Sequence, residues 1–462
     1  MENKLLNSTK WLRLGKLQIF WVFILFLSLN IIVFGLTPPD SFIMWDTYDY
    51  LEAAKRLINE GVYSSEIRLP GYPFLLSGLM LLTDNIGLAT ILIQVILAFL
   101  AGLLAAHLAE GIRSSTGTLT LLLVCFNPVT IFYVQTMLSD MLFASLFIVH
   151  LYSLVKVTKT QSGWLALVAG VTAGLAAVVR GNGQFLILTM PLIILLSYSF
   201  HEQRKHWTRA LRIIVIALVG SLIIVAPWLH LNWKDGNGVS FTSLAYRNMV
   251  IHENVIAAAA HTKGISMAES KGLVYDSVIN HAKIPSENWN IIGTLDRHLI
   301  VARHAFAIMG EVCGFYIVWG MVKALAKFFF VSDGRGWSQI FQQDVKERLQ
   351  LNSYQKKSNA YSLTAVWRNE PLVSTKTLFF HVTTIGFTLF MRLFNLFGLS
   401  YLVRNKMWGI LLTFALYTTI FASTGGFFGY SRFRLPLEPL LAILASLGAL
   451  EASLWFKNQR IR

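Results

Sequence analysis

Long stretches of apolar residues recur along the whole sequence and limit the fold more than any other feature. A helix that crosses the hydrocarbon core of a bilayer needs about 20 such residues. Charged residues make up 14% of the chain, whereas soluble globular proteins carry about 25%. These features exclude a soluble enzyme and predict an all-α polytopic membrane protein with about 10 transmembrane helices. The predicted spans are Leu17–Leu36, Gly87–Leu108, Leu119–Tyr133, Met141–Val157, Trp164–Val179, Phe185–Phe200, Ile213–Leu231, Phe380–Val403, Trp408–Ala422 and Leu437–Phe456.

The chain is strongly basic, with 39 Lys and Arg against 24 Asp and Glu and a formal net charge of +15. A basic excess can indicate nucleic-acid binding, but DNA-binding domains do not contain such apolar runs, so no nucleic-acid partner is expected. The positive-inside rule explains the excess, because Lys and Arg concentrate in cytoplasmic loops. Both ends of the chain are therefore predicted to lie in the cytoplasm. The supporting residues are Lys4, Lys10, Arg13, Lys16, Arg113, Lys156, Lys159, Arg204, Lys205, Arg209, Arg212, Arg404, Lys406, Lys457, Arg460 and Arg462.

The topology divides the chain into three segments. Residues 1–231 form an N-terminal transmembrane module whose first outer loop is 37–72. Its first apolar run is too long for a signal-peptide core and is expected to be a retained span. Residues 232–377 form an extracytoplasmic loop, and residues 378–462 carry the C-terminal transmembrane helices.

Two further apolar stretches are predicted to lie in the outer membrane interface. Tyr72–Leu82 is too short to span the bilayer. His304–Phe330 contains Glu311 and Lys323, and a crossing there would place the basic C-terminal tail outside. An interfacial helix accommodates such charged residues.

Six charged residues are placed by this topology at the outer mouths of the spans. Charge close to a bilayer is costly and suggests function. Simpler interpretations stay open for some of them, because carboxylates at helix starts cap the helix or complement its dipole, and an interfacial arginine can extend to headgroups. Arginines on the outer side oppose the positive-inside bias, which favours an anion such as phosphate as their ligand. The six residues are Asp46, Arg68, Asp140, Arg180, Arg432 and Arg434.

Four motifs in these regions resemble those of the GT-C membrane glycosyltransferases, in the broad group that contains the protein O-mannosyltransferases and the lipid A aminoarabinose transferases. The resemblance extends from the first span to the last and implies a GT-C fold with interfacial helices and extracytoplasmic loops. The motifs are Asp46-x-x-x-Tyr50-x-x-Ala53, Arg68-x-Pro70-Gly-Tyr-Pro73, Ser139-Asp140-x-x-Phe143 and Tyr430-x-Arg432-x-Arg434-Leu-Pro436-x-x-Pro439.

The resemblance implies a glycosyltransferase that moves one sugar from a polyprenyl-phosphate donor to a lipid, glycan or protein acceptor outside the cytoplasm. Its members use an aspartate in the first loop, which here is Asp46. Two positions depart from the named branches, because several relatives have Asp-Glu where this chain has Asp46-Thr47, and the aminoarabinose transferases tend to have Lys-Pro-Pro at Leu69-Pro70-Gly71. The implied roles are catalysis for Asp46 and Asp140, donor-phosphate binding for Arg68, Arg180, Arg432 and Arg434, and substrate binding for Tyr50, Tyr72 and Tyr430.

The expected partners also include membrane lipids. No cofactor is required, and no metal ligands are assigned, although a divalent cation is compatible with the family. Mostly short loops favour a prokaryotic inner membrane, with the active site facing outward.

Two other functions stay open at this point. A transporter or flippase of lipid-linked sugars would also need arginines near the headgroup, but transporters place functional charges near the midplane. Arg392 and His381 in the eighth span are charged or titratable residues to which the sequence assigns no role. A degenerate family member could also serve as a binding partner of an active enzyme, an alternative that the presence of Asp46 disfavours.

The topology predicts opposite labelling of two positions. A cysteine placed at Ser353 should react with an impermeant maleimide in intact cells, whereas one at Gln459 should react only after permeabilisation. Labelling of position 459 but not of position 353 in intact cells would invert the topology.

Overall fold

A computed structural model describes residues 15–37, 43–44, 46–61, 63, 68–200, 207–236, 238–330, 337, 340–341, 375–428 and 431–459. Regular secondary structure within these ranges consists of α-helices and short 3-10 helices, which confirms the predicted all-α class. In this part of the chain, eight helices are long and apolar enough to cross a membrane, or up to nine if a bent pair counts as one span. The chain is therefore a multi-pass membrane protein.

Each of the predicted spans coincides with a helix or a helix pair. Some of these helices are bent or too short for a straight membrane crossing. One pair bends by 49°, because Asn127 caps a new helix that begins at Pro128. Two others have 17 residues each, where a crossing needs about 20. The helices are α1 (Lys16–Leu36), α4 (Ile86–Ile112), the pair α5 (Gly117–Cys125) and α6 (Pro128–Val134), α7 (Asp140–Thr160), α8 (Gly163–Val179), α9 (Gln184–Phe200), α10 (Trp207–Lys234), α19 (Thr375–Arg404), α20 (Trp408–Gly425) and α22 (Glu438–Gln459).

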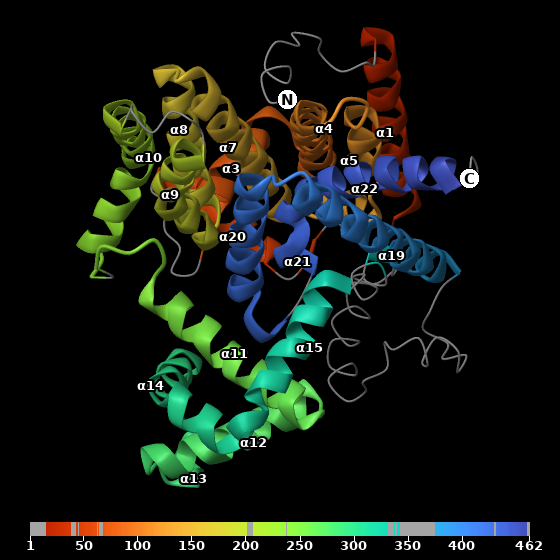
Figure 1. The fold of residues 1–462 in the computed structure, drawn as a ribbon. Coiled ribbons are helices and arrows are strands. Elements are labelled where there is room, and N and C mark those ends of the chain that lie inside the picture. Colours follow the sequence, from red (N-terminus) through yellow and green to blue (C-terminus); the bar gives the residue numbers. More distant parts are fainter. Residues whose placement is uncertain are drawn as a thin grey trace.

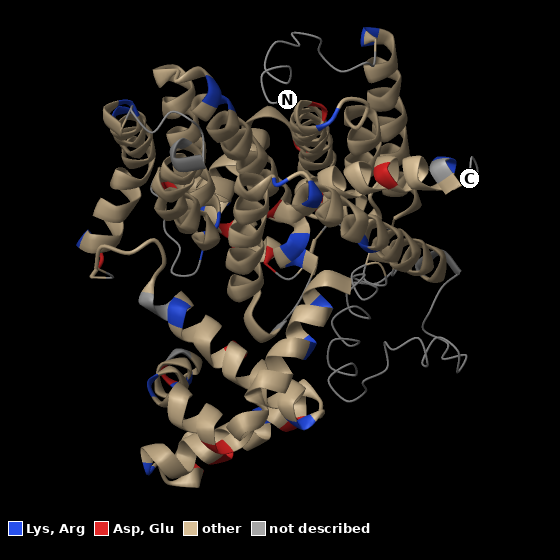
Figure 2. Ribbon diagram, in the orientation of Figure 1, with Lys and Arg blue, Asp and Glu red and all other residues tan. Residues whose placement is uncertain are grey.

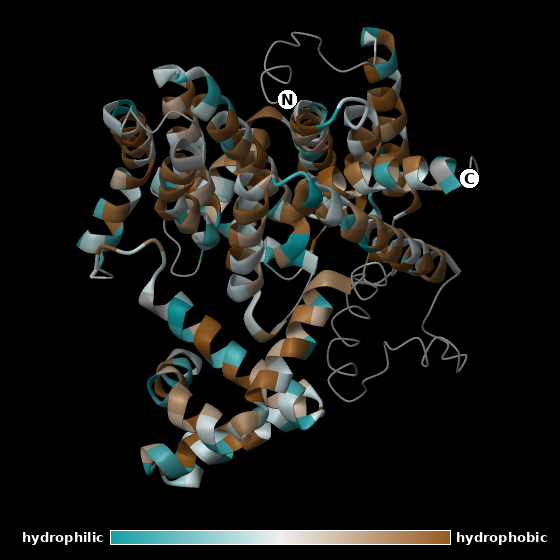
Figure 3. Cartoon of the chain, viewed as in Figure 1, coloured by the Kyte–Doolittle hydropathy of each residue, from teal (hydrophilic) through white to brown (hydrophobic). Residues whose placement is uncertain are grey.

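The segment after α10 folds into a helical body that projects from one side of these helices, and we call it the lower body from its place in Figure 1. In it, α11 packs against α12, α14 and α15 around an apolar core that includes Val255, Val274 and Val301. Its surface mixes polar and apolar residues, whereas the helices above it are mostly apolar (Figure 3). The lower body comprises α11 (Leu244–Lys263), α12 (Met267–Ala282), α13 (Ser286–Trp289), α14 (Thr294–Cys313) and α15 (Ile317–Phe330).

The apolar stretch that the sequence places in the outer interface belongs to α14 and α15. The segment Asp296–Phe330 is long and apolar enough to cross a membrane, yet both of its helices pack against α11. Phe306 and Phe315 expose 92% and 89% of their surface, which suits contact with lipid at an interface. The placement of this stretch outside the cytoplasm stays a prediction.

Two glycines let α19 and α22 approach each other closely. A Cβ atom at Gly398 would lie 2.0 Å from the carbonyl oxygen of Leu444, and one at Gly448 would lie 1.9 Å from that of Phe394. Small residues allow such backbone contact between membrane helices. The contact fixes the position of α22 against α19, and α21 (Ser431–Arg434) precedes α22 in the chain.

Replacing Gly398 by Ala is expected to destabilise the protein by about 1–3 kcal/mol, because the methyl group would overlap the backbone of α22. Gly386→Ala on the same helix is the matched control, since a Cβ atom there meets no atom within 4 Å. Thermal unfolding of both variants in detergent measures the difference. Equal melting temperatures for the two variants would contradict this packing.

Candidate active site

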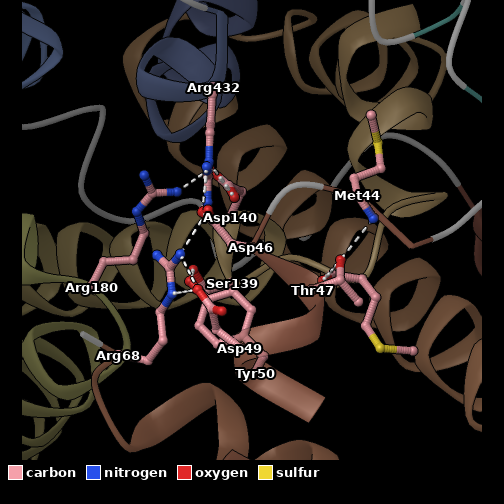
Figure 4. A network of polar contacts seen from close by, with 11 residues as sticks. Met44, Asp46, Thr47, Asp49, Tyr50, Arg68, Ser139, Asp140, Arg180 and Arg432 are labelled. Atoms are coloured by element: carbon pink, nitrogen blue, oxygen red, sulfur yellow. Dashed lines mark hydrogen bonds and ion pairs between the residues drawn. The ribbon is translucent and has the colours of Figure 1, made fainter. Parts of the chain in front are cut away.

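Six charged side chains meet in one place, which we call the charged cluster (Figure 4). Its member Arg432 lies on α21, at the side of the membrane helices from which the lower body projects (Figure 1); Figure 2 shows Lys and Arg next to Asp and Glu in this part of the molecule. Five of the six residues that the sequence singled out are brought together there, with Asp49 in addition. The members are Asp46 before α2 (Thr47–Glu60), Asp49 on α2, Arg68 before α3 (Gly71–Leu82), Asp140 at the start of α7, Arg180 after α8 and Arg432 on α21.

Asp46 accepts hydrogen bonds from two arginines. Its Oδ1 lies 2.8 Å from Nη2 of Arg68, and its Oδ2 lies 2.7 Å from Nη1 of Arg432. Asp46 holds the N-cap position of α2, but its side chain makes no capping hydrogen bond. Its charge is thus directed to the arginines, and the simple capping interpretation does not hold.

Arg68 is held inside the cluster and does not extend to the headgroups. Its guanidinium pairs with Asp49 at 2.6 Å as well as with Asp46, and 13% of its side chain is exposed. The guanidinium also lies 5.2 Å from the ring centroid of Tyr50. These three contacts fix its orientation.

Asp140 is the most deeply buried acid of the cluster, with 1% of its side chain exposed. Nε of Arg432 donates to both of its carboxylate oxygens at 3.0 and 2.9 Å. Nη1 of Arg180 pairs with the same carboxylate (Figure 4). Arg432 therefore bridges the two aspartates.

The electrostatic setting of Asp46 makes it a strong acid. Burial alone would raise the pKa of its carboxyl group, but the positive charges of Arg432 and Arg68 outweigh burial and lower the pKa from the ordinary value of 3.8 to about 2. A general base works best with a pKa near the operating pH. In this arrangement Asp46 is ionised at neutral pH and is a weak base.

Two of the predicted substrate-binding tyrosines border the cluster. The rings of Tyr50 and Tyr72 meet edge to face at 5.0 Å, and the hydroxyl of Tyr50 lies 3.0 Å from that of Ser139. Burial raises the pKa of both phenols, and for Tyr72 the neighbouring Tyr50 and Asp140 raise it further. The Tyr72 hydroxyl is buried and has no hydrogen-bond partner among the described residues.

The side chains that hold the irregular segment before Asp140 were not predicted from the sequence. Residues 135–139 are buried and lie between α6 and α7. Buried backbone of this kind, cut off from water, must find its hydrogen bonds within the protein. Isolated amides inside apolar spans, such as Gln94, were the signal that could have revealed it. The bonds are Gln94 Nε2 to the carbonyl oxygens of Val134 (3.2 Å) and Thr136 (2.8 Å), Gln135 Nε2 to Oδ1 of Asn30 (3.0 Å), and Thr47 Oγ1 to the carbonyl oxygen of Met137 (3.0 Å).

Two other predicted site residues are not part of the cluster as described. Arg434 is fully buried, and its Nε donates to Glu438 at 2.5 Å. Because residues two apart on a helix point in different directions, Arg434 faces away from the aspartates that Arg432 contacts. Tyr430 lies outside the described residues.

The described ranges contain no group of three or more His, Cys, Asp or Glu side chains that could hold a metal ion. The three carboxylates of the charged cluster are each engaged by an arginine.

Residues 68–231 match the family model of the dolichyl-phosphate-mannose-protein mannosyltransferases. The predicted family resemblance is confirmed. The match covers about one third of the chain and includes Arg68, Tyr72, Asp140 and Arg180, whereas Asp46 and Arg432 lie outside it. No protein of curated function matches the chain. Among solved structures, the crystal structure of ArnT from Cupriavidus metallidurans bound to undecaprenyl phosphate aligns with 91% of this chain and 77% of its own, at 14% sequence identity and a TM-score of 0.41.

The depressed pKa of Asp46 predicts how its contribution to stability depends on pH. A carboxyl group whose pKa is lower in the folded state stabilises the fold above its unfolded pKa, and this contribution is lost as the pH falls through the folded value. The shift from 3.8 to about 2 corresponds to about 2 kcal/mol.

Unfolding of the wild type and of Asp46→Asn, measured across pH in detergent, is expected to show a gap in stability at pH 7. The gap should shrink between about pH 4 and pH 2. A gap of constant size down to about pH 2 would assign the effect to something other than the carboxylate charge.

Proposed function

We propose that this chain is a glycosyltransferase that moves a sugar from a polyprenyl-phosphate carrier to an acceptor outside the cytoplasm. The family match on residues 68–231 supports a transferase of the mannosyltransferase type, whose described donor is a lipid-phosphate sugar. The observation that carries the proposal is the charged cluster, in which three guanidinium groups surround Asp46 and Asp140. Guanidinium groups bind phosphate by paired hydrogen bonds.

The charge balance of the cluster indicates how the donor would act on it. Arg68, Arg180 and Arg432 face the carboxylates of Asp46, Asp49 and Asp140, so positive and negative charges are equal in number. An incoming phosphate must compete with these carboxylates for the same N–H groups. As Arg432 and Arg68 turn to the phosphate, they withdraw the charges that depress the pKa of Asp46. Donor binding thereby converts a weak base into a stronger one.

In the transfer step Asp46 takes the proton of an acceptor hydroxyl while the acceptor oxygen attacks the anomeric carbon of the sugar. The bond between that carbon and the phosphate oxygen breaks, and its electron pair leaves with the polyprenyl phosphate. The additional negative charge on the leaving phosphate is stabilised by the guanidinium groups, which are already in place and need little reorganisation. Attack from the face opposite the leaving phosphate inverts the anomeric carbon.

The three arginines differ in how many donors they can offer to the phosphate. Arg180 pairs with Asp140 through one nitrogen, Nη1, and 14% of its side chain is exposed. Arg432 uses Nε and Nη1 for the two aspartates. Among the described residues, Arg180 is therefore the arginine best able to receive the phosphate first, with Arg432 following as its ion pairs exchange.

The transporter alternative gains no support from Arg392, the charged residue that most favoured it. Nη2 of Arg392 lies 3.2 Å from Glu438, and Nε donates to the carbonyl oxygen of Phe329 at 3.1 Å. Both partners belong to the protein and neither requires a transported ligand, while Nη1 of Arg392 is buried without a partner among the described residues.

The decisive experiment compares Asp46→Asn with Asp49→Asn in purified protein saturated with a polyprenyl-phosphate sugar. Both changes remove one carboxylate from Arg68, but only Asp46 is proposed to accept the proton. Asp46→Asn is expected to slow transfer by roughly 100-fold to 10,000-fold with donor binding retained, and Asp49→Asn by far less.

Two outcomes would contradict the proposal. An Asp46→Asn variant with near-normal turnover would remove Asp46 from the proton transfer and make Asp140 the next carboxylate to test. Absence of sugar transfer by the wild type to any lipid, glycan or protein acceptor of the cell envelope would exclude the transferase function itself.

A further inference from the structure

A second buried charge network lies beside the charged cluster, on the other face of α21. Arg434 and Glu438 form an ion pair at 2.5 Å, one helical turn apart. Arg392 on α19 reaches the same carboxylate at 3.2 Å. Asn127 donates to its other oxygen at 3.0 Å. Arg434 is fully buried, and Glu438 is 2% exposed.

This network has two guanidinium groups for one carboxylate, and the remaining positive charge is directed at the end of α15. Nη1 of Arg434 donates to the carbonyl oxygen of Phe328 at 2.5 Å, and Nε of Arg392 donates to that of Phe329 at 3.1 Å. These carbonyls belong to the last turn of α15, where helix carbonyls have no partner within the helix. The C-terminus of a helix also carries partial negative charge, which cations stabilise.

The network links the lower body to α21 and α19, because α15 is the last helix of the lower body. Its C-terminal turn is attached to α21 and α19 by two buried arginines. α15 also packs directly against α21, and Lys323 on α15 donates to the carbonyl oxygen of His261 on α11. A continuous set of contacts therefore runs from the lower body through α15 to α21.

Arg432 and Arg434 are two residues apart on the same four-residue helix. A helix of this length cannot hold its own direction by internal hydrogen bonds. Its orientation must come from the contacts of its side chains, of which those of Arg434 and Ser431 are fully buried; the Ser431 hydroxyl lies 3.1 Å from that of Tyr133. Whatever fixes Arg434 also fixes Arg432 relative to Asp46 and Asp140.

We propose that Arg434, Glu438 and Arg392 are positioning residues that act through Arg432. They hold α21 so that Arg432 bridges Asp46 and Asp140, and they couple this arginine to the lower body by capping α15. The proposal rests on the proposed function for its effect on transfer. It reassigns Arg434 from contact with donor phosphate to control of the neighbouring arginine.

The test compares Arg434→Gln with Glu438→Gln in full-length protein, using turnover of a polyprenyl-phosphate sugar. Glu438 is not proposed to contact the phosphate. Even so, Glu438→Gln should have the same effect on turnover as Arg434→Gln. Both variants are expected to lower kcat by about 100-fold, as displacement of a catalytic group by about 1 Å can do. The double variant should be no slower than either single variant, because the two residues act as a unit.

Hydrogen exchange provides a readout that does not depend on activity. In Glu438→Gln, amide exchange should increase both in residues 431–437 and in the last turn of α15, whereas Arg432→Gln should leave α15 protected. Glu52→Gln is the matched control, because Glu52 also forms an ion pair four residues away, with Arg56, but at the exposed surface. It should change neither turnover nor exchange.

The results of these experiments test the positioning role of Arg434 and Glu438 separately from the proposed transferase function. If Arg434→Gln raised the donor KM at unchanged kcat and Glu438→Gln had no effect, Arg434 would be a phosphate contact and the inference would be wrong. Unchanged exchange in α15 of Glu438→Gln would also overturn it. A wild type without transfer activity would remove the proposed function, and hydrogen exchange alone would then decide whether this network holds α21 and α15.

Discussion

The bridge that Arg432 makes between Asp46 and Asp140 is the interaction on which the rest of the site depends. Taking charged groups out of water is costly, and removing one partner of a buried pair leaves an uncompensated charge. Arg432 contacts both aspartates, while Arg68 and Arg180 each contact one of them. Removing any one of these residues would leave a neighbouring charge without one of its partners. The cluster therefore holds together segments that belong to opposite ends of the chain.

The pairing of these buried charges also determines whether Asp46 can act as a base. With equal numbers of guanidinium and carboxylate groups the cluster is balanced in the absence of a ligand, and Asp46 is too acidic to act as a base. A phosphate ligand would disturb this balance and release a carboxylate at the moment when a base is needed. In the proposed function, donor binding and base activation are thus one electrostatic event, with no separate switch.

Around the cluster, the membrane interior imposes a second requirement, that buried backbone and buried charge find partners inside the protein. Residues 135–139 satisfy it through Gln94, Gln135 and Thr47, which leaves Asp140 in a defined position at the start of α7. Arg392 and Arg434 find partners in Glu438 and the last carbonyls of α15, and Nη1 of Arg392 alone in this network is buried without a partner among the described residues.

The sequence by itself determined the helices and the list of charged residues to consider. Apolar runs reveal spans because bilayer thickness fixes their length, and each predicted span coincides with a helix or a helix pair. The positive-inside rule orients every loop. The resulting topology predicted that five outer-face residues could meet, namely Asp46, Arg68, Asp140, Arg180 and Arg432. Only the tertiary structure decided which charges pair, since Arg432 and Asp140 are 292 positions apart and no local pattern encodes such a contact. It also decided that Arg434 faces Glu438, because packing against α15 and α19 sets the direction of a helix too short to set its own.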